Sequence, residues 1–319
     1  NIWNNDRFVQ DVQFNTTGTW ELYHNHFTLH LHNPESRIPS RFTQNNSGAI
    51  TINCDTRLDT DTVFGGTGTG TVTINGRAVE TDATHGLRQG LYGPGSLTKE
   101  GSYTLALENY ASYRGATVIN EGTLLFNAES AQANPAFASE DPSTWTWVPV
   151  TMGQVTVNSG ATLGGSGILR APVTVKSGAN FAPGAGAAGI FTIDNDLTLN
   201  AGSNTRIELG GLTPGSGSGH HDQAIVTGQL SLGGTLNISL FGGYMPTVGA
   251  SYTIFQYGSL DASANAFDTI APAIVADYGS GANDVVTITV TELAHYYTRG
   301  HATDDWWGRA ENWGFGMVP

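Results

Sequence analysis

The sequence is poor in cysteine and in charged residues. Cys54 is the single cysteine, and only 13% of the 319 residues are charged. One cysteine excludes an internal disulfide, and an extracellular chain without disulfides is more typical of bacteria than of small secreted animal domains. Cys54 falls on the same strand face as Ile50 and Ile52, so we interpret it as a small buried hydrophobe. No apolar run approaches the roughly 18 residues of a membrane helix, and we expect no membrane insertion.

Basic residues are scarce. The chain has 13 Lys and Arg against 27 Asp and Glu, which gives a formal net charge of -14. An acidic surface repels phosphate backbones, so we expect no nucleic-acid partner. The same balance is compatible with divalent cations or neutral glycans, and its ordinary role is solubility. The chain starts at Asn1 without an initiator Met, and we expect a processed or excised piece.

Apolar residues at helical spacing are also rare, whereas a short alternating pattern recurs. The segment 155–163, VTVNSGATL, returns as 173–181, VTVKSGANF. Each copy reads as a short strand, a polar turn with Gly and a second short strand. A unit this small buries its apolar side only when copies stack above and below it. The repeat therefore predicts a solenoid with stacked Val, Ile, Leu and Phe inside and Gly and Asn at the corners.

The repeating pattern does not cover the whole chain. We expect an N-terminal non-repeat cap or assembly segment at 1–45, a β-helix at 46–292 and a Trp-rich C-terminal assembly segment at 293–319. Two stretches interrupt the β-helix, a Pro- and Trp-bearing one at 127–154 and a Gly/Ser/Pro loop at 210–219. Long excursions from a solenoid lie on its surface, where recognition is usual.

The stretch 93–126 resembles the autotransporter-associated (passenger-associated) β-strand repeat. The pattern positions are filled by Gly95, Leu97, Lys99, Gly101, Leu105, Leu107, Tyr113, Gly115, Thr117, Gly122 and Leu124. Tyr103 departs from the second Gly of the pattern, and Glu108 replaces a small polar residue. The likeness runs through about two-thirds of the chain. It implies an all-β, right-handed parallel β-helix (β-solenoid) displayed outside a bacterial cell, and it says little about chemistry because the repeat is a scaffold.

Histidines form the sharpest local feature. His24, His26, His30 and His32 share parity, so a continuous strand would project all four from one face. Neighbouring histidines could join a zinc or copper site if another strand supplied a further ligand. The alternative is a polar ladder of neutral imidazoles. We favour the ladder and expect no metal and no cofactor.

Three further groups could carry chemistry. Asp55, Asp59 and Asp61 could form the carboxylate groove of a polysaccharide lyase or hydrolase, or they could be solvated turn positions. Trp145 and Trp147 could stack on a sugar ring or partner, or could cover the β-helix. The run 217–222, GSGHHD, lacks a nucleophile-elbow pattern, and we interpret it as loop.

The sequence therefore predicts a non-enzymatic structural or adhesion protein, secreted or on a bacterial cell surface, with no catalytic residues. A β-helix has two open ends, and both ends of this chain carry Trp-rich segments, so we expect head-to-tail self-assembly into a filament. Expected partners are copies of the chain itself, and surface glycans are further candidates. The alternatives are a polysaccharide-binding or polysaccharide-cleaving β-helix and a monomeric adhesin passenger.

Overall fold

The computed structural model describes residues 7–15, 17–23, 28–34, 38–76, 90–133, 147–279 and 284–291. The chain divides into two compact units, Asn1–Thr174 and Val175–Pro319. The regular structure in the described residues consists of β-strands, which confirms the all-β prediction. No helix capable of crossing a membrane is found among these residues.

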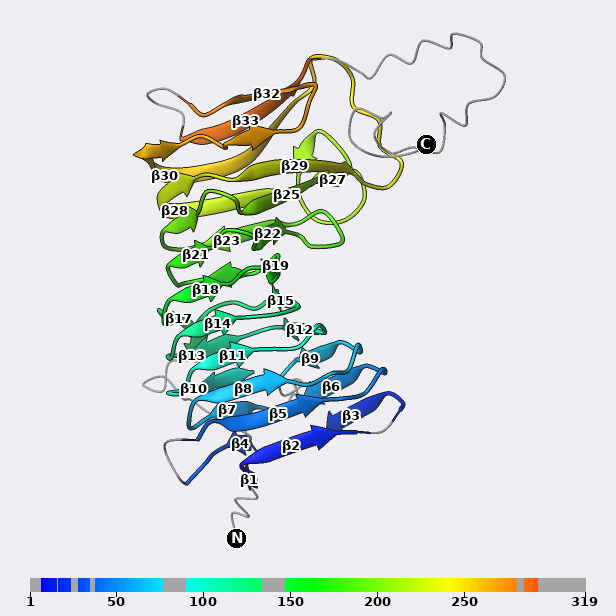
Figure 1. Ribbon diagram of the computed structural model, residues 1–319, viewed down its shortest axis with the longest axis vertical. Helices are drawn as coiled ribbons and strands as arrows, with labels where there is room; N and C mark the ends of the chain where they lie inside the picture. Colours follow the sequence, from blue (N-terminus) through cyan, green and yellow to red (C-terminus); the bar gives the residue numbers. More distant parts are fainter. Residues whose placement is uncertain are drawn as a thin grey trace, which may run out of the picture. The chain divides into compact units, whose positions relative to one another are not determined.

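The first unit is built from three sheets of short strands stacked in parallel (Figure 1). Sheet A contains β1 (Arg7–Val9), β4 (Leu29–Leu31), β7 (Thr56–Leu58), β10 (Leu91–Gly93) and β13 (Ala111–Tyr113). Sheet B contains β2 (Asp11–Phe14), β5 (Ser40–Gln44), β8 (Thr62–Gly65), β11 (Leu97–Lys99), β14 (Thr117–Ile119) and β18 (Val155–Val157). Sheet C contains β3 (Trp20–Tyr23), β6 (Ile50–Asn53), β9 (Val72–Ile74), β12 (Thr104–Leu107), β15 (Thr123–Phe126) and β19 (Thr162–Gly165).

The chain visits the sheets in the order A, B, C and then starts the next turn, which makes the unit a parallel β-helix as predicted. Alternate residues of each strand face inward because the side-chain period of a strand is 2. In β18, for example, Val155 and Val157 are buried and Thr156 is half-exposed. Inward residues of successive turns stack, and the rings of Phe14, Phe42 and Phe64 form a column with centroids 5.3 Å apart at each step. This column continues the core through the first three turns.

Glycine and asparagine occupy corners between strands, as the sequence predicts. Gly66 has a φ of 124°, and a Cβ there would lie 2.2 Å from the carbonyl oxygen of Gln44 in the preceding turn. Only glycine permits this approach without displacing backbone. At another corner, the amide of Asn75 donates to Asn53 Oδ1 at 2.8 Å. Such contacts satisfy polar groups where the strands end.

The predicted excursion at 127–154, between β15 and β18, starts later than expected, because Glu129 still forms parallel bridges with Tyr110 and Ile168 of the neighbouring turns. Its described ends form β16 (Ala131–Ala133) and β17 (Trp147–Pro149), which pair antiparallel. Residues 134–146 lie outside the described part. The short strand β20 (Ile168–Leu169) follows β19, and β21 (Val173–Val175) lies at the boundary of the two units.

The second unit repeats the parallel stacking with longer strands. Its strands are β22 (Asn180–Pro183), β23 (Ile190–Ile193), β24 (Leu197–Leu199), β25 (Asn204–Leu209), β26 (Thr213–Pro214), β27 (His220–His221), β28 (Gln223–Leu232), β29 (Thr235–Leu240), β30 (Ser251–Asn265), β31 (Thr269–Ile270), β32 (Ile274–Asp277) and β33 (Val285–Val290). In one parallel stack, β22, β25, β29 and β31 follow one another, and in another β23 and β24 pair with β28, which pairs with β30.

The pairing changes direction at the last described strands of this unit. β33 pairs antiparallel with β30, and β32 pairs antiparallel with β33. The edge that β30 offers is thus covered by strands of the opposite sense. The sequence predicts three parts, 1–45, 46–292 and 293–319, and this division stays a prediction. The two compact units meet at Thr174 and Val175, inside the predicted β-helix, and do not test its ends.

Candidate functional site on the outer face of sheet A

The outer face of sheet A brings together side chains from four successive turns. Phe8, His30, Arg57 and Tyr92 are each the middle residue of a strand, and they pair in register from β1 through β4 and β7 to β10. In β4 the flanking Leu29 and Leu31 point into the core, so the middle residue points outward. In β7 Thr56 and Leu58 are likewise buried on either side of Arg57, and the in-register pairing places the four side chains in one continuous row.

The row consists of planar groups that lie against one another. The rings of Phe8 and His30 stack with centroids 4.3 Å apart and an interplanar angle of 29°. Arg57 Cζ lies 5.9 Å from the centroid of the Tyr92 ring, within cation–π range. Phe8 is 62% exposed, so one face of this row is an aromatic surface open to solvent.

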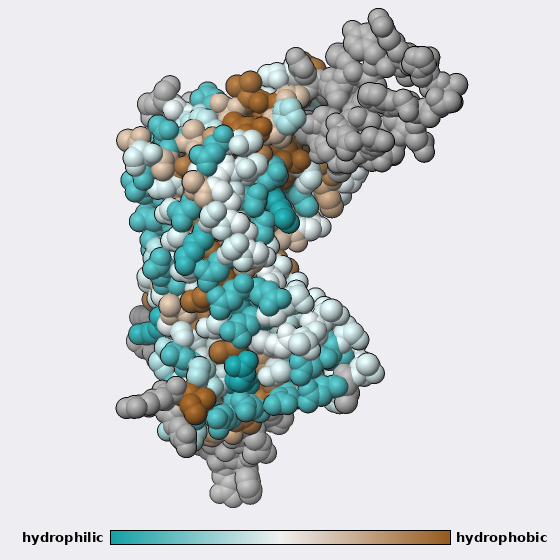
Figure 2. Space-filling view, in the orientation of Figure 1, coloured by the Kyte–Doolittle hydropathy of each residue, from teal (hydrophilic) through white to brown (hydrophobic). Residues whose placement is uncertain are grey.

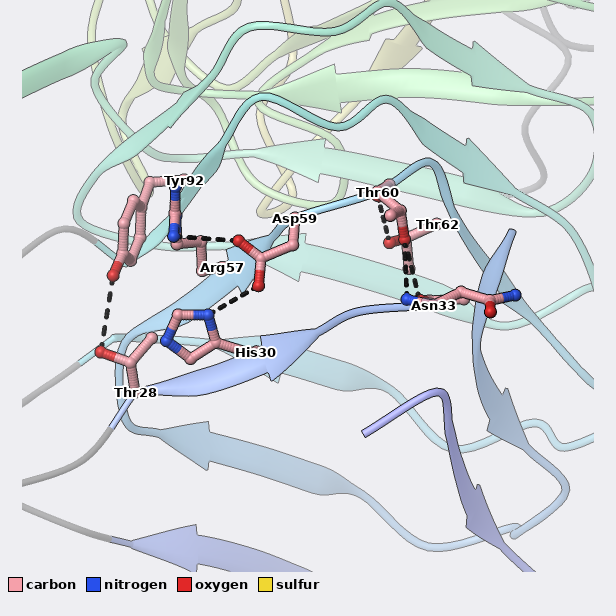
Figure 3. A network of polar contacts seen from close by, with 9 residues as sticks. Thr28, His30, Asn33, Arg57, Asp59, Thr60, Thr62 and Tyr92 are labelled. Atoms are coloured by element: carbon pink, nitrogen blue, oxygen red, sulfur yellow. Dashed lines mark hydrogen bonds and ion pairs between the residues drawn. The ribbon is translucent and has the colours of Figure 1, made fainter. Parts of the chain in front are cut away.

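A carboxylate orders the centre of the row (Figure 3). Asp59, which follows β7, lies 2.7 Å from His30 Nδ1 through one oxygen and 3.0 Å from Arg57 Nη1 through the other. On the same side, the hydroxyl of Tyr92 donates to Thr28 Oγ1 at 3.5 Å. Because Asp59 contacts both the imidazole and the guanidinium, the relative positions of His30 and Arg57 are fixed.

The predicted histidine face is confirmed only in its middle. His30 is outward on β4, but the strand ends at Leu31, so His32 follows it in irregular backbone. The Phe8 ring contacts both, and it meets His32 edge-on at 6.0 Å. His24 and His26 lie outside the described residues. Within the described part of the chain, no three His, Cys, Asp or Glu side chains gather as a metal site would require.

The three aspartates do not share a site. Asp59 is held as described above, while Asp55 is buried and its Oδ1 accepts the Gly90 N–H at 3.3 Å. Asp61 accepts the backbone N–H and the hydroxyl of Ser96 at 3.1 and 2.7 Å. Burial of Asp55 corrects the view that all three are solvated turn positions. Each carboxylate bonds a neighbouring turn, and the three do not face one another across a groove.

Cys54 is fully buried, as predicted, and burial raises the pKa of its thiol to about 12. A thiol with that pKa stays protonated and unreactive. Trp145 lies outside the described residues, and Trp147 belongs to β17, which places its backbone on the excursion.

The interpretation of 217–222 as loop is wrong at its end. His220 and His221 form β27, and both His221 and Asp222 are completely buried. Asp222 accepts the N–H groups of Gly189 and Glu208 at 2.9 and 2.8 Å. Burial raises the pKa of Asp222 to about 8 and lowers that of His221. The hydrogen-bond partners of these two residues come from segments distant in the sequence, so the local pattern did not reveal the burial.

The geometry of sheet A suits binding better than bond cleavage. Aromatic faces, a guanidinium and a carboxylate are groups that contact sugar rings and polar partners. Asp59 is already committed to two positive or hydrogen-bonding partners, and the row contains no second carboxylate to act with it. On the surface in Figure 2, hydrophilic and weakly polar residues predominate, and hydrophobic ones occur in small groups. The fold is a parallel β-helix, and sheet A presents this row of aromatic and charged side chains on its outer side.

Comparison with known proteins points in the same direction. The chain is 31% identical over 209 residues to the adhesin BmaC autotransporter of Brucella suis biovar 1 (strain 1330). The aligned part covers 65% of this chain and 5% of that relative, so the chain spans a small fraction of its length. No family model matches the chain. The autotransporter-associated repeat therefore stays a prediction, while the similarity to an autotransporter adhesin agrees with it.

Proposed function

We propose that this chain is a non-enzymatic β-helical segment of a bacterial surface or secreted protein that acts in adhesion. The observation that carries the proposal is the similarity to an autotransporter adhesin over 65% of the chain. The similarity extends along repeat turns, and the parallel β-helix is the scaffold in which such turns stack. We therefore expect this chain to act in adhesion, as the name of the relative indicates for that protein.

The outer face of sheet A is the adhesive surface in this proposal. Phe8 offers an exposed ring, and Arg57 has 39% of its side chain exposed while it lies over Tyr92. Stacking on an aromatic face combined with hydrogen bonds to a guanidinium is a common way to hold a sugar ring. A surface glycan is therefore the partner class that fits this row.

Adhesion is tested by coating fluorescent beads with the purified chain and counting beads retained on cell layers and on an array of immobilised glycans. We expect retention above that of protein-blocked beads. A variant with both Phe8→Ala and Tyr92→Ala should lose most of it, whereas Leu212→Ala, an exposed apolar substitution far along the sequence, should not. Retention equal to blocked beads on every surface contradicts adhesion. Release of sugar fragments from soluble polysaccharides would favour the cleaving alternative.

Self-association is a second candidate function, and the first turn favours it. β1, β2 and β3 stand at the start of the three sheets, and each pairs on one side within the described residues. The Phe column ends there at Phe14, and the neighbouring Trp20 is 44% exposed. Unpaired strand edges next to apolar side chains are sites for pairing with another chain. This is the finer form of the proposal, a head-to-tail filament through the terminal segments.

Negative-stain electron microscopy of the whole chain beside a variant lacking 302–319 tests the filament. Fibres from the whole chain that disappear in the variant support assembly through the termini. Monodisperse particles from both at high concentration contradict it and leave a monomeric adhesin passenger.

A further inference from the structure

The carboxylate of Asp59 compensates the charge of Arg57 at the centre of the outer row of sheet A (Figure 3). Its Oδ1 lies 3.0 Å from Arg57 Nη1, and its Oδ2 lies 2.7 Å from His30 Nδ1. The Asp59 side chain is 12% exposed, and its backbone N–H donates to the carbonyl oxygen of Leu31 at 3.1 Å. Asp59 therefore cannot turn away from the guanidinium without giving up its contact with His30.

Arg57 still offers hydrogen-bond donors to a ligand. A guanidinium has five N–H groups, the contact with Asp59 involves Nη1, and 39% of the Arg57 side chain is exposed. Its Cζ lies 5.9 Å from the centroid of the Tyr92 ring, which supports one face of the guanidinium. The group that reaches solvent at this point therefore donates hydrogen bonds but carries a charge that is already paired.

A paired guanidinium distinguishes uncharged ligands from acidic ones. A sugar hydroxyl accepts a hydrogen bond from Arg57 without bringing a charge, so the nearby Asp59 does not oppose it. A ligand carboxylate bound to the same guanidinium would lie close to Asp59, and repulsion between the two anions offsets the attraction to Arg57. The net charge of -14 adds a weaker repulsion at longer range.

We propose that Asp59 is a specificity-determining residue of the sheet A row, which makes the row select uncharged glycans over acidic ones. This inference rests on the proposed adhesive role of the row and names the glycan class that it binds. Asp59 acts through Arg57, because it positions the guanidinium and compensates its charge. Without that charge compensation the row would present an unpaired arginine, and arginine binds carboxylates well.

Bead retention on matched glycans tests this selectivity in the whole chain. The surfaces carry polygalacturonate or its methyl ester, which share the sugar chain and differ in charge. Asp59→Asn keeps the size of the side chain and an oxygen for His30. Asp61→Asn is the control, because it makes the same change in net charge at a carboxylate that bonds Ser96. We expect Asp59→Asn to be retained on the acid about three- to fivefold more than Asp61→Asn, the size of an exposed ion pair.

Two further measurements separate charge compensation from a purely structural role. The gained retention should fall back when sodium chloride rises from about 0.05 to 0.5 M, because salt screens the attraction between charges. It should also disappear when Asp59→Asn is combined with Arg57→Gln, since the gain requires the guanidinium. A variant in which sheet A was merely loosened would lose retention on both surfaces and would show neither dependence.

Equal retention of Asp59→Asn and Asp61→Asn on the acid overturns the inference, as does a parent chain that prefers the acid to the ester. Should Asp59→Asn fail to fold, the parent chain decides. Its preference for uncharged glycans should persist at high salt, and strong, salt-sensitive retention on acidic glycans contradicts the proposed selectivity.

Failure of the proposed function would look different. The parent chain would then be retained no better than blocked beads on every glycan and cell layer. The comparison of Asp59→Asn with Asp61→Asn on the acid decides the role of Asp59 in that case too, because it measures a gain that the parent chain lacks.

Discussion

Lys99 Nζ lies 3.8 Å from the centroid of the Tyr103 ring, inside the core of the first unit. Lys99 is completely buried, and its ammonium group donates to the carbonyl oxygens of Glu100, Gly101 and Glu121 at 2.9, 2.7 and 3.2 Å. Three donors thus meet three acceptors at one corner, with an aromatic face completing the site. Lys99 thus occupies an inward position of β11, and its ammonium group links this turn to Glu121 of the next one.

Substitution of this lysine should destabilise the first unit. Lys99→Met keeps much of the apolar stem but leaves three carbonyl oxygens without their donor, and we expect the free energy of unfolding to fall by about 3 kcal/mol. Urea denaturation followed by circular dichroism measures the change. The control is Lys176→Met, the same substitution at an exposed lysine, which should shift stability by less than about 0.5 kcal/mol. Equal effects of the two variants would contradict the role assigned to the buried contacts.

The same lysine should give the protein a measurable pH dependence. Burial lowers the pKa of Lys99 from 10.5 to about 8. Between these two pH values the unfolded chain binds a proton that the folded chain has released, so the free energy of unfolding rises with pH. The rise should be on the order of 1–3 kcal/mol. Comparing the chain with Lys99→Met from pH 7.5 to 10.5 isolates it, and parallel curves for the two proteins would disprove the shift.

Alanine substitutions at two corner glycines should separate the cost of a left-handed backbone from the cost of a steric clash with the neighbouring turn. Gly101 has a φ of 77°, and a Cβ there would lie 2.2 Å from the carbonyl oxygen of Gly66; Gly160 has a φ of 84° and open space around it. Gly160→Ala should cost about 1 kcal/mol for the left-handed backbone alone. Gly101→Ala should cost more because backbone must also move. Thermal unfolding of both variants measures the difference. Similar melting temperatures would show that the close approach of Gly101 to Gly66 adds no cost beyond that of the left-handed backbone.

Asp222 should be a structural residue of the second unit. Replacement by Ala leaves the buried N–H groups of Gly189 and Glu208 without an acceptor, and we expect a loss of about 3 kcal/mol. Asp284→Ala, at an exposed position, provides the control. Hydrogen exchange at Gly189 and Glu208 locates the effect. Unchanged protection of these two amides would mean that other groups hold them.

Arginine at position 57 should matter for adhesion through its shape. Arg57→Lys retains the charge but loses the flat guanidinium that lies over Tyr92 and bonds Asp59. We expect bead retention on the bound surface to fall about two- to fivefold, the size of an exposed cation–π contact. The melting temperature should change little, since the side chain is partly exposed. A variant that binds as well as the parent would remove Arg57 from the adhesive row.

The sequence is sufficient to predict the strands and the corners between them, because both depend on residues close together in the sequence. Val155 and Val157 had to share the inner face, since a strand alternates its side chains, and a repeat of such strands buries apolar groups only by stacking. The burial of Cys54 follows from the same alternation. The corner glycines follow from positive φ angles that other residues avoid. These local features are sufficient to determine the fold class, an all-β solenoid.

Only the tertiary structure decided which outward residues meet. Phe8, His30, Arg57 and Tyr92 belong to turns of unequal length, so their spacing in the sequence carries no sign that they form one row. The contact of Asp59 with His30 likewise depends on which turn stacks on which. The buried Lys99 ammonium donates to Glu121 of the next turn as well as to its own neighbours Glu100 and Gly101, and the buried His221 ring contacts carbonyl oxygens of Gly211 and Thr253. Registers between turns are set by packing along the whole stack, and a short repeat pattern does not encode them.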